Sequence, residues 1–207
     1  MRGDWEAQAE GKFLRHWFKI VDVIPTQARW VRYWDLAATE PKPGTDPDYT
    51  VGVLMGHANG EYFIADVQRA RMTPMNVEAL IKQTAQTDRQ TYGYVSTRME
   101  MEPGSSGINV IDYYVRLLAG YDFKGDRVTG PSEIRANGLA SMAQAGHVHM
   151  LSAHWNKVAL DEFQLFPGGG HDDIVTSATG AFNELTNVPK VNTKAIIMVG
   201  ERLRPDW

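Results

Sequence analysis

Residues Tyr49–Arg69 have the sequence YTVGVLMGHANGEYFIADVQR, which predicts a β-hairpin. Two strand-like segments, Tyr49–Gly56 and Glu61–Arg69, flank the dipeptide Asn59-Gly60, which favours the tight turn between antiparallel strands. Upstream, Arg29–Ala37 is rich in aromatic and β-branched residues and predicts another strand. The proline-rich stretch between this strand and the hairpin predicts a loop. Sequential strands of this kind predict a three-stranded antiparallel meander.

Downstream of the hairpin, helical and strand-like patterns alternate. Helices are expected at Met75–Thr87, Gly107–Leu118, Ser132–Ala145, Trp155–Phe166 and Asp173–Leu185, and strands at Tyr92–Met101, His147–Leu151 and within 120–131. We expect Ser132 to cap its helix and Gly146 to end it. A meander followed by parallel βα units predicts an α/β fold, with a mixed sheet and helices on both faces. We expect one domain at residues 29–186, after a lead-in segment at 1–28 and before a tail at 187–207.

The composition is that of an ordinary globular protein, with 207 residues, 43% hydrophobic and 22% charged. The absence of cysteine excludes disulfides and thiolate zinc sites, so any metal must be held by oxygen or imidazole. No apolar run approaches the roughly 20 residues that span a bilayer, which predicts a soluble, intracellular protein without membrane contact. The net charge of -4 argues against a domain covered in phosphate contacts, although acids that hold cations contribute to it.

Acidic residues stand at the ends of the predicted elements. Asp35 lies near the end of the first long strand, Glu100 and Glu102 end another, and Asp172 and Asp173 stand where the last helix begins. Because side chains alternate along a strand, Glu100 and Glu102 are expected to point the same way. Adjacent acids at a helix start compete for the same few N–H groups, so one is explained as a cap and the pair is not.

Such carboxylates, if they converge, cannot all ionise without cations, and Mg²⁺ or Mn²⁺ are the natural partners of oxygen ligands. Two ions about 3.5 to 4 Å apart would activate a water and stabilise the leaving oxygen of a phosphodiester. Each acid also has an ordinary use, as a helix cap, a turn residue or a solvated strand residue. The spacing alone leaves both interpretations open.

The segments that carry these acids resemble the nuclease domain of the large terminase subunit of tailed bacteriophages. The resemblance rests on Arg32–Ala37, Met99–Gly107 and Phe166–Asp173, and extends to Asp66–Arg69 and Ile134–Ala136. It covers roughly residues 29–185. It implies an RNase H-like fold and a metal-dependent endonuclease that cuts concatemeric viral DNA during packaging.

The resemblance also implies roles for the acids. Asp35 would bridge two Mg²⁺ or Mn²⁺ ions, and Glu102 would be the second ligand. Asp173 is the first choice from the last pair, with Asp172 as a supporting acid. Glu100 is a further candidate because it shares the expected face of Glu102.

The implied partners are double-stranded DNA, the terminase ATPase domain, the small terminase subunit and the portal, in the host cytoplasm. No phosphate-binding loop of the Gly-x-x-x-x-Gly-Lys-Ser/Thr type is present, so ATP hydrolysis is not expected. Ser132 stands where the family often carries a lysine. Candidate DNA contacts are therefore Arg135, Lys157, His171 and Arg98.

Other interpretations remain open at this stage. A junction resolvase or integrase would keep the fold and change the substrate. A docking module would grip DNA or a portal ring, and its acids would serve only as caps and surface charge. Gly104–Gly107 is interpreted as a tight strand-to-helix turn rather than a phosphate loop. His147, His149 and His154, which have no acid near them in the sequence, are interpreted as surface residues.

Overall fold

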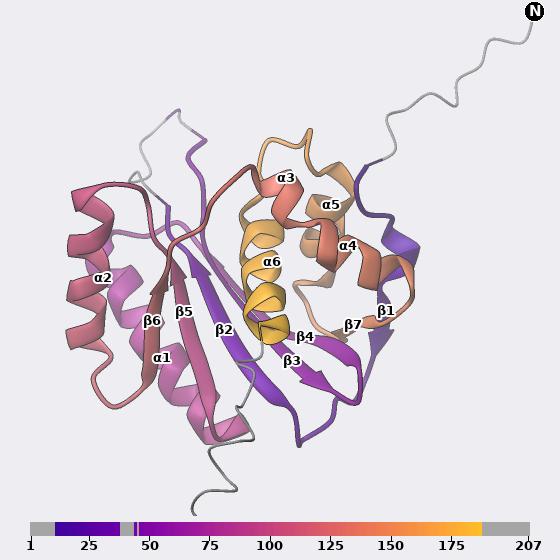
Figure 1. The fold of residues 1–207 in the computed structure, drawn as a ribbon, viewed down its shortest axis with the longest axis horizontal. Helices are drawn as coiled ribbons and strands as arrows, with labels where there is room; N and C mark the ends of the chain where they lie inside the picture. The colour runs from indigo at the N-terminus through magenta and orange to yellow at the C-terminus, as the bar shows by residue number, and fades with distance from the viewer. Residues whose placement is uncertain (1–10, 38–43, 45, 188–207) are drawn as a thin grey trace, which may run out of the picture.

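The computed structural model describes residues 11–37, 44 and 46–187, which form a seven-stranded mixed sheet with helices on both faces (Figure 1). The strand order is β1-β7-β4-β3-β2-β5-β6. The elements are η1 (Arg15–Trp17), β1 (Lys19–Val21), β2 (Arg29–Asp35), β3 (Thr50–Ala58), β4 (Glu61–Ala70), α1 (Pro74–Tyr92), β5 (Val95–Glu100), α2 (Ser105–Leu117), β6 (Asp122–Asp126), α3 (Ser132–Arg135), α4 (Asn137–Gln144), β7 (Val148–Leu151), α5 (Asn156–Leu165) and α6 (Asp173–Thr186).

The predicted meander is confirmed. β2 pairs antiparallel with β3, and β3 pairs antiparallel with β4. Asn59 and Gly60 both have positive φ angles, 54° and 82°, as the tight hairpin turn requires. The register shifts between Leu54 and Met55, where a bulge leaves one residue of β4 without a partner. The remaining strands, β5, β6, β7 and β1, add to the meander in parallel, which confirms the mixed α/β fold.

The two faces of the sheet bury different side chains. Alternate residues of β2 point to opposite faces, so Tyr33 packs in the core beneath α6 and Trp34 packs beneath α1 and α2. α6 crosses the centre of one face beside α3, α4 and α5, while α1 lies behind the sheet (Figure 1). α6 approaches β2 closely at Gly180, which has no side chain. A Cβ added there would lie 2.3 Å from Cζ of Tyr33.

Helix α1 is longer than predicted, because it continues past Thr87 to Tyr92 and the next strand starts only at Val95. Its last buried positions include polar residues, which hid the helical pattern. Asp88 accepts two hydrogen bonds from the buried guanidinium of Arg32, at 2.8 and 2.7 Å. A buried ion pair of this kind holds the end of the helix on the sheet without an apolar signal in the sequence.

The predicted helix at Ser132–Ala145 is divided at Ala136 into α3 and α4. The prediction that Ser132 caps it is wrong, because Pro131 occupies the capping position and its carbonyl accepts the N–H groups of Ile134 and Arg135. Gly146 ends the helix as expected, with a φ of 81°.

The described part of the lead-in segment is packed on the same core. β1 pairs with β7, and Phe13 and Phe18 are buried against Phe163, with ring centroids 4.9 and 4.6 Å away. Residues 1–10 and the predicted tail beyond Asn187 lie outside the described residues. None of the helices that the structure describes has the length and apolarity needed to cross a membrane.

Candidate metal centre

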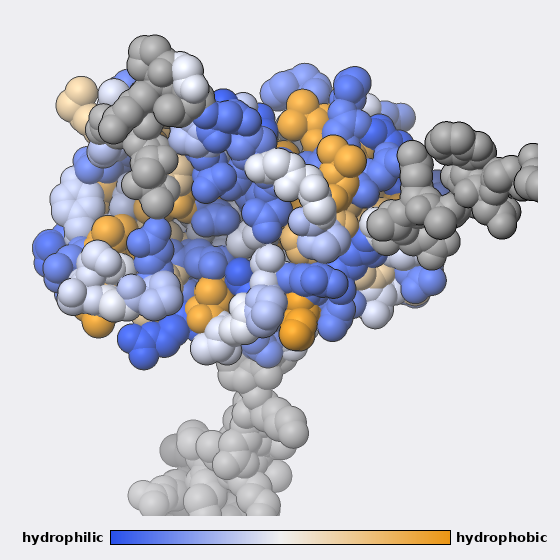
Figure 2. Space-filling model, turned by 90° about the horizontal axis from the view of Figure 1, so that it is seen from above, coloured by the Kyte–Doolittle hydropathy of each residue, from blue (hydrophilic) through white to orange (hydrophobic). Residues whose placement is uncertain are grey.

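Acidic residues from separate elements meet at one edge of the sheet. Asp35 is the last residue of β2 and Glu100 the last of β5, and the pairing of Trp34 with Met99 brings the two strand ends side by side. α6 begins at the same edge with Asp173, preceded by Asp172. Seen from above, this edge of the molecule is mostly hydrophilic (Figure 2).

The electrostatic state of Asp35 shows that these acids act on one another. Burial, and then the charges of Glu100, Asp173 and Asp172, raise the pKa of Asp35 to about 8, although Arg135 opposes the shift. The metal-free carboxyl is therefore mostly protonated at neutral pH. A bound cation would restore its charge, so the donor set fits a hard divalent ion.

Asp173 is the more enclosed of the two aspartates. It is 5% exposed, and one carboxylate oxygen accepts the backbone N–H of Tyr49 at 3.2 Å. Burial raises the pKa of Asp173, and that hydrogen bond partly offsets the rise. His171 Nδ1 lies 3.8 Å from the same carboxylate.

Neither aspartate uses its carboxylate to cap α6. Asp172 holds the capping position, but within the described residues its side chain makes no cap bond and instead accepts the hydroxyl of Ser132 at 3.4 Å. Glu162 of α5 takes that role: its Oε1 accepts the N–H groups of Ile174 at 2.5 Å and Val175 at 3.4 Å.

Glu162 was missed because it belongs to a different helix. Burial raises its pKa to about 7, the Ile174 N–H opposes this shift, and the charge of Asp173 adds to it. The sequence does contain a signal: Glu162 stands between the buried Ala159 and Phe163 on the apolar stripe of α5. A carboxylate at such a position requires a buried partner.

Glu100 and Glu102 do not occupy equivalent places. β5 ends at Glu100, whose carboxylate accepts hydrogen bonds from Arg135 at 3.1 and 3.3 Å. Glu102 is exposed and lies beyond the strand end, on the turn into α2. The expectation that strand alternation aligns the two is wrong for this reason. The geometry brings Glu100 beside Asp35, and the ligand role of either residue stays a prediction.

Among the described residues, the one group of three potential ligand atoms that lies together includes Asp173 but not Asp35, Glu100, Glu102 or Asp172. Asp48, His171 and Asp173 each offer a ligand atom, and these atoms all lie within 4.8 Å of one another. His171 Nδ1 is buried without a hydrogen-bond partner in the described structure and lies 3.7 Å from Asp48 Oδ1. Asp48 was not predicted, because it stands in the proline-rich loop where no element pattern marks it.

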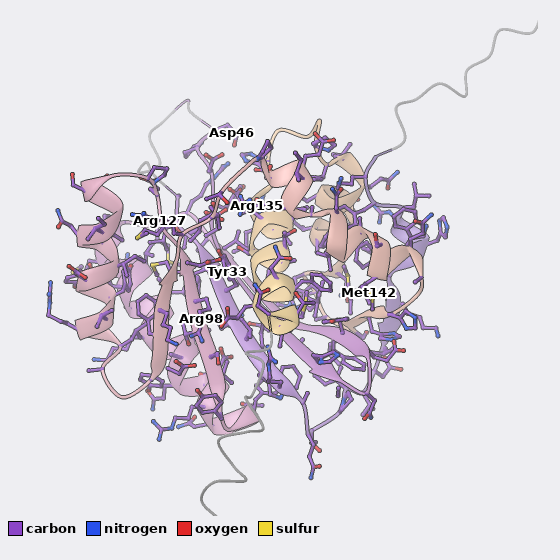
Figure 3. The ribbon with its side chains drawn as sticks, in the orientation of Figure 1. Tyr33, Asp46, Arg98, Arg127, Arg135 and Met142 are labelled. Atoms are coloured by element: carbon purple, nitrogen blue, oxygen red, sulfur yellow. The ribbon has the colours of Figure 1, made fainter. Side chains whose placement is uncertain are left out.

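The predicted DNA contacts separate into two groups. Arg135 and His171 lie at the acidic edge, where they contact Glu100 and approach Asp173, respectively. Arg98 sits lower on the sheet (Figure 3), where it binds Glu184 and Asp122, at 2.7 and 3.2 Å. Lys157 pairs with an aspartate on the exposed side of α5.

The glycine turn before α2 and the histidine group near β7 lie in different surroundings. Gly104 has a φ of 98°, and a Cβ at Gly107 would lie 2.0 Å from the carbonyl oxygen of Glu102, so the glycines fit a tight turn. The prediction that the three histidines are surface residues is confirmed for His147 and His154, which are exposed, and is wrong for His149, which is buried. His147 and His149 do have an acid nearby, because both contact Glu61, at 2.8 and 2.7 Å.

This seven-stranded mixed sheet with helices on both faces matches the RNase H-like fold of terminase nuclease domains. The chain belongs to the terminase RNaseH-like domain family, whose model matches residues 32–185. No curated protein matches the chain.

Solved structures show the same fold. The large terminase nuclease from the thermophilic phage G20c with bound cobalt has a TM-score of 0.60 and 18% identity, and covers 85% of this chain and 98% of its own. The human cytomegalovirus terminase nuclease domain, soaked with Mn, has a TM-score of 0.60 and 10% identity, with coverages of 79% and 86%. The Thermus phage P74-26 large terminase nuclease domain has a TM-score of 0.54 and 18% identity, with coverages of 82% and 92%.

Proposed function

We propose that this chain is a metal-dependent endonuclease that cuts double-stranded DNA. The observation that carries the proposal is the convergence of Asp35, Glu100, Asp172 and Asp173 at one edge of the sheet, where the pKa of Asp35 rises to about 8. So much negative charge in a partly buried place is the chemistry of a divalent-cation site rather than of caps and surface charge. The similar nucleases from phage G20c were solved with bound magnesium, cobalt or zinc.

Asp35 and Asp173 would hold two Mg²⁺ or Mn²⁺ ions, with Asp172 and either Glu100 or Glu102 completing the set. Two such ions supply an activated water and a positive charge at the leaving oxygen of a phosphodiester. The residues of this chain orient the acids. The Tyr49 N–H fixes one oxygen of Asp173, and Glu162 fixes the first turn of α6.

The family match supports a role for the proposed reaction in viral DNA packaging. The substrate would then be concatemeric DNA, and the partners would be a terminase ATPase domain, the small terminase subunit and the portal, in the host cytoplasm. Two alternative functions predict different experimental results. A resolvase would cut branched DNA in preference to linear duplex, and a docking module would bind no Mn²⁺ through Asp35 and Asp173.

The decisive experiment is plasmid cleavage with Mn²⁺ or Mg²⁺. Asp35→Asn should abolish cutting, and isothermal titration should show the loss of Mn²⁺ binding. Asp112→Asn, an exposed position on α2, changes the net charge equally and should leave both unchanged. Undiminished metal-dependent cleavage by the Asp35 variant would refute the proposal.

A further inference from the structure

Two arginines absent from the sequence-based candidates stand at the acidic edge. Arg69 lies near the end of β4, and Arg71 follows the strand directly. Arg135 is already engaged by Glu100, and Arg98 and Lys157 are paired elsewhere. A chain with a net charge of -4 and an acidic centre needs cationic groups beside that centre if it is to hold a polyanion.

The two arginines are stacked on one aromatic ring. The guanidinium carbon of Arg69 lies 3.2 Å from the ring centroid of Tyr49, and that of Arg71 lies 3.7 Å from it. Stacking on a ring restricts a long side chain and leaves the N–H edges of the guanidinium for other partners. The backbone N–H of the same tyrosine donates to Asp173, so the stack is attached directly to a proposed metal ligand.

Two donors of this stack have no hydrogen-bond partner in the described structure. They are Nε of Arg69 and Nε of Arg71, and both atoms are buried. Arg69 Nε is 4.0 Å from the nearer oxygen of Glu162, too far for a hydrogen bond. About a quarter of each side chain is exposed, 24% for Arg69 and 23% for Arg71. Arg71 contacts Asp46, which is itself 75% exposed, and its Nη2 also lies 3.3 Å from Nε2 of His171. A phosphate can replace the exposed aspartate as a partner.

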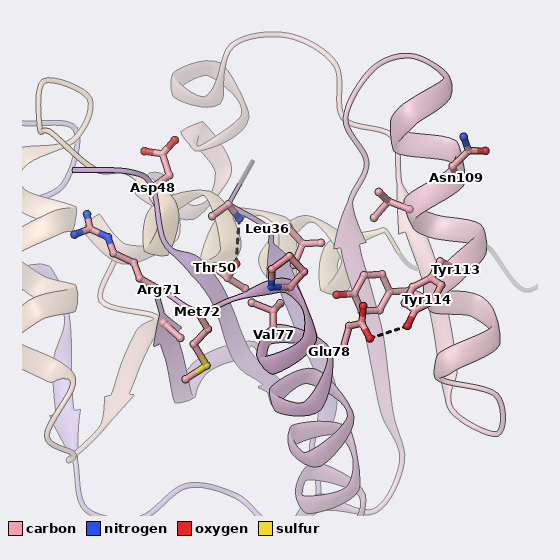
Figure 4. A pocket seen from close by; sticks show the side chains of 14 residues that line it. Leu36, Asp48, Thr50, Arg71, Met72, Val77, Glu78, Asn109, Tyr113 and Tyr114 are labelled. Atoms are coloured by element: carbon pink, nitrogen blue, oxygen red, sulfur yellow. Dashed lines mark hydrogen bonds between the residues drawn. The ribbon is translucent and has the colours of Figure 1, made fainter. Parts of the chain in front are cut away.

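A cavity limits the direction from which an anion reaches Arg71. The cavity holds about 390 Å³, and Arg71 and Asp48 lie on one side of it while Tyr113 and Tyr114 lie on the other (Figure 4). Its remaining wall includes Leu36 and several other apolar side chains. A phosphate would avoid that interior, so it would meet Arg71 on the side of Arg69 and Asp173.

We propose that Arg69 and Arg71, held on Tyr49, bind backbone phosphates of the DNA strand beside the bond to be cut. The inference rests on the proposed function and names the substrate contact of the same site. Guanidinium groups bind phosphate through paired hydrogen bonds, and phosphates of one strand follow at about 3.4 Å of helical rise. A phosphate next to the one that reacts at the proposed metal site would therefore lie near the stack, which the Tyr49 N–H joins to Asp173.

The test measures binding of a fluorescent duplex oligonucleotide in EDTA, so that it does not depend on cleavage. Each phosphate contact adds about 0.9 to the slope of log Kd against log salt between about 50 and 200 mM. Arg69→Gln and Arg71→Gln should each weaken binding and lower the slope by about 0.9, and the double variant by about 1.8. Arg116→Gln, an exposed arginine on α2, should change neither quantity.

Asp46→Asn provides a test in the opposite direction at an exposed position, where unfolding is not expected. Removing this competitor of phosphate should tighten DNA binding severalfold. The proposal is overturned if the double variant keeps the parent slope while its thermal melt is normal, if Asp46→Asn weakens binding, or if the parent shows no salt-dependent binding. A parent that binds DNA through these arginines but never cuts it with Mn²⁺ would refute the proposed function alone.

Discussion

Replacing Asp35 with asparagine should stabilise the metal-free protein, although the same change should abolish the proposed nuclease activity. The ordinary pKa of this carboxyl is 3.8, and burial together with the neighbouring acids raises it to about 8. Between these values the folded protein binds a proton that the unfolded chain has released. The free energy of unfolding therefore falls as pH rises through this window.

The magnitude follows from the difference in pKa. Each pKa unit corresponds to about 1.36 kcal/mol. The ionisation of Asp35 therefore lowers the free energy of unfolding by up to about 1.6 kcal/mol at pH 5 and up to about 4 kcal/mol at pH 7. Asparagine has a similar shape and does not titrate. Even half of the cost at pH 7 would raise the melting temperature by about 4 to 8 °C in a protein of this size.

The assay is thermal unfolding in EDTA at about pH 5, 7 and 8.5, a range chosen to span the shifted pKa. The advantage of Asp35→Asn should grow with pH, and added Mn²⁺ should reduce it by stabilising only the parent. Asp112→Asn, an exposed carboxylate, controls for the change in net charge. If the variant melts at or below the parent temperature at every pH, burial and the neighbouring acids do not destabilise ionised Asp35, and the reasoning is refuted.

Three further outcomes are expected. Glu100→Gln and Glu102→Gln should separate the rival ligands, and we expect the larger loss of Mn²⁺ affinity by titration for Glu100, which lies beside the strand end of Asp35. Gly180→Ala should lower the free energy of unfolding in urea by about 1 to 3 kcal/mol, because its Cβ would lie 2.3 Å from an aromatic ring of β2. Gly168→Ala is the control: its Cβ would meet only one carbonyl, at 3.8 Å, and the loss of stability should be small. Burial raises the pKa of Glu162 from 4.5 to about 7, so its ionisation lowers the free energy of unfolding as pH rises between these values. Glu162→Gln should remove this decrease, which melting temperatures measured across the same pH range would show.

The fold was predictable because its signals are local. Asn59-Gly60 specifies a turn by its own backbone preferences, and the alternation around it specifies the strands. The end of α1 was not predictable in the same way. Asp88 is buried only because Arg32, 56 residues earlier in the chain, reaches it. No short window of sequence contains both members of such a pair.

The site was predictable in part, for the same physical reason. Asp35, Asp172 and Asp173 stand at the ends of elements whose patterns are clear, so the edge where they meet follows from the topology. The choice between Glu100 and Glu102 depended on where β5 ends, and strand ends are the least certain feature of a pattern. Asp48 has no element around it and emerges only from the folded structure.

The cap supplied by Glu162 leaves both adjacent aspartates available to the proposed metal centre. A helix start has unpaired N–H groups, and a carboxylate of the first turn ordinarily turns inward to accept them. Here a carboxylate from α5 accepts two of those groups, so neither Asp172 nor Asp173 needs to do so. Both remain close enough to Asp35 for their charges to raise its pKa. Hydrogen bonds at the helix start therefore do not reduce the electrostatic repulsion among the carboxylates of Asp35, Asp172 and Asp173. A bound cation would reduce it.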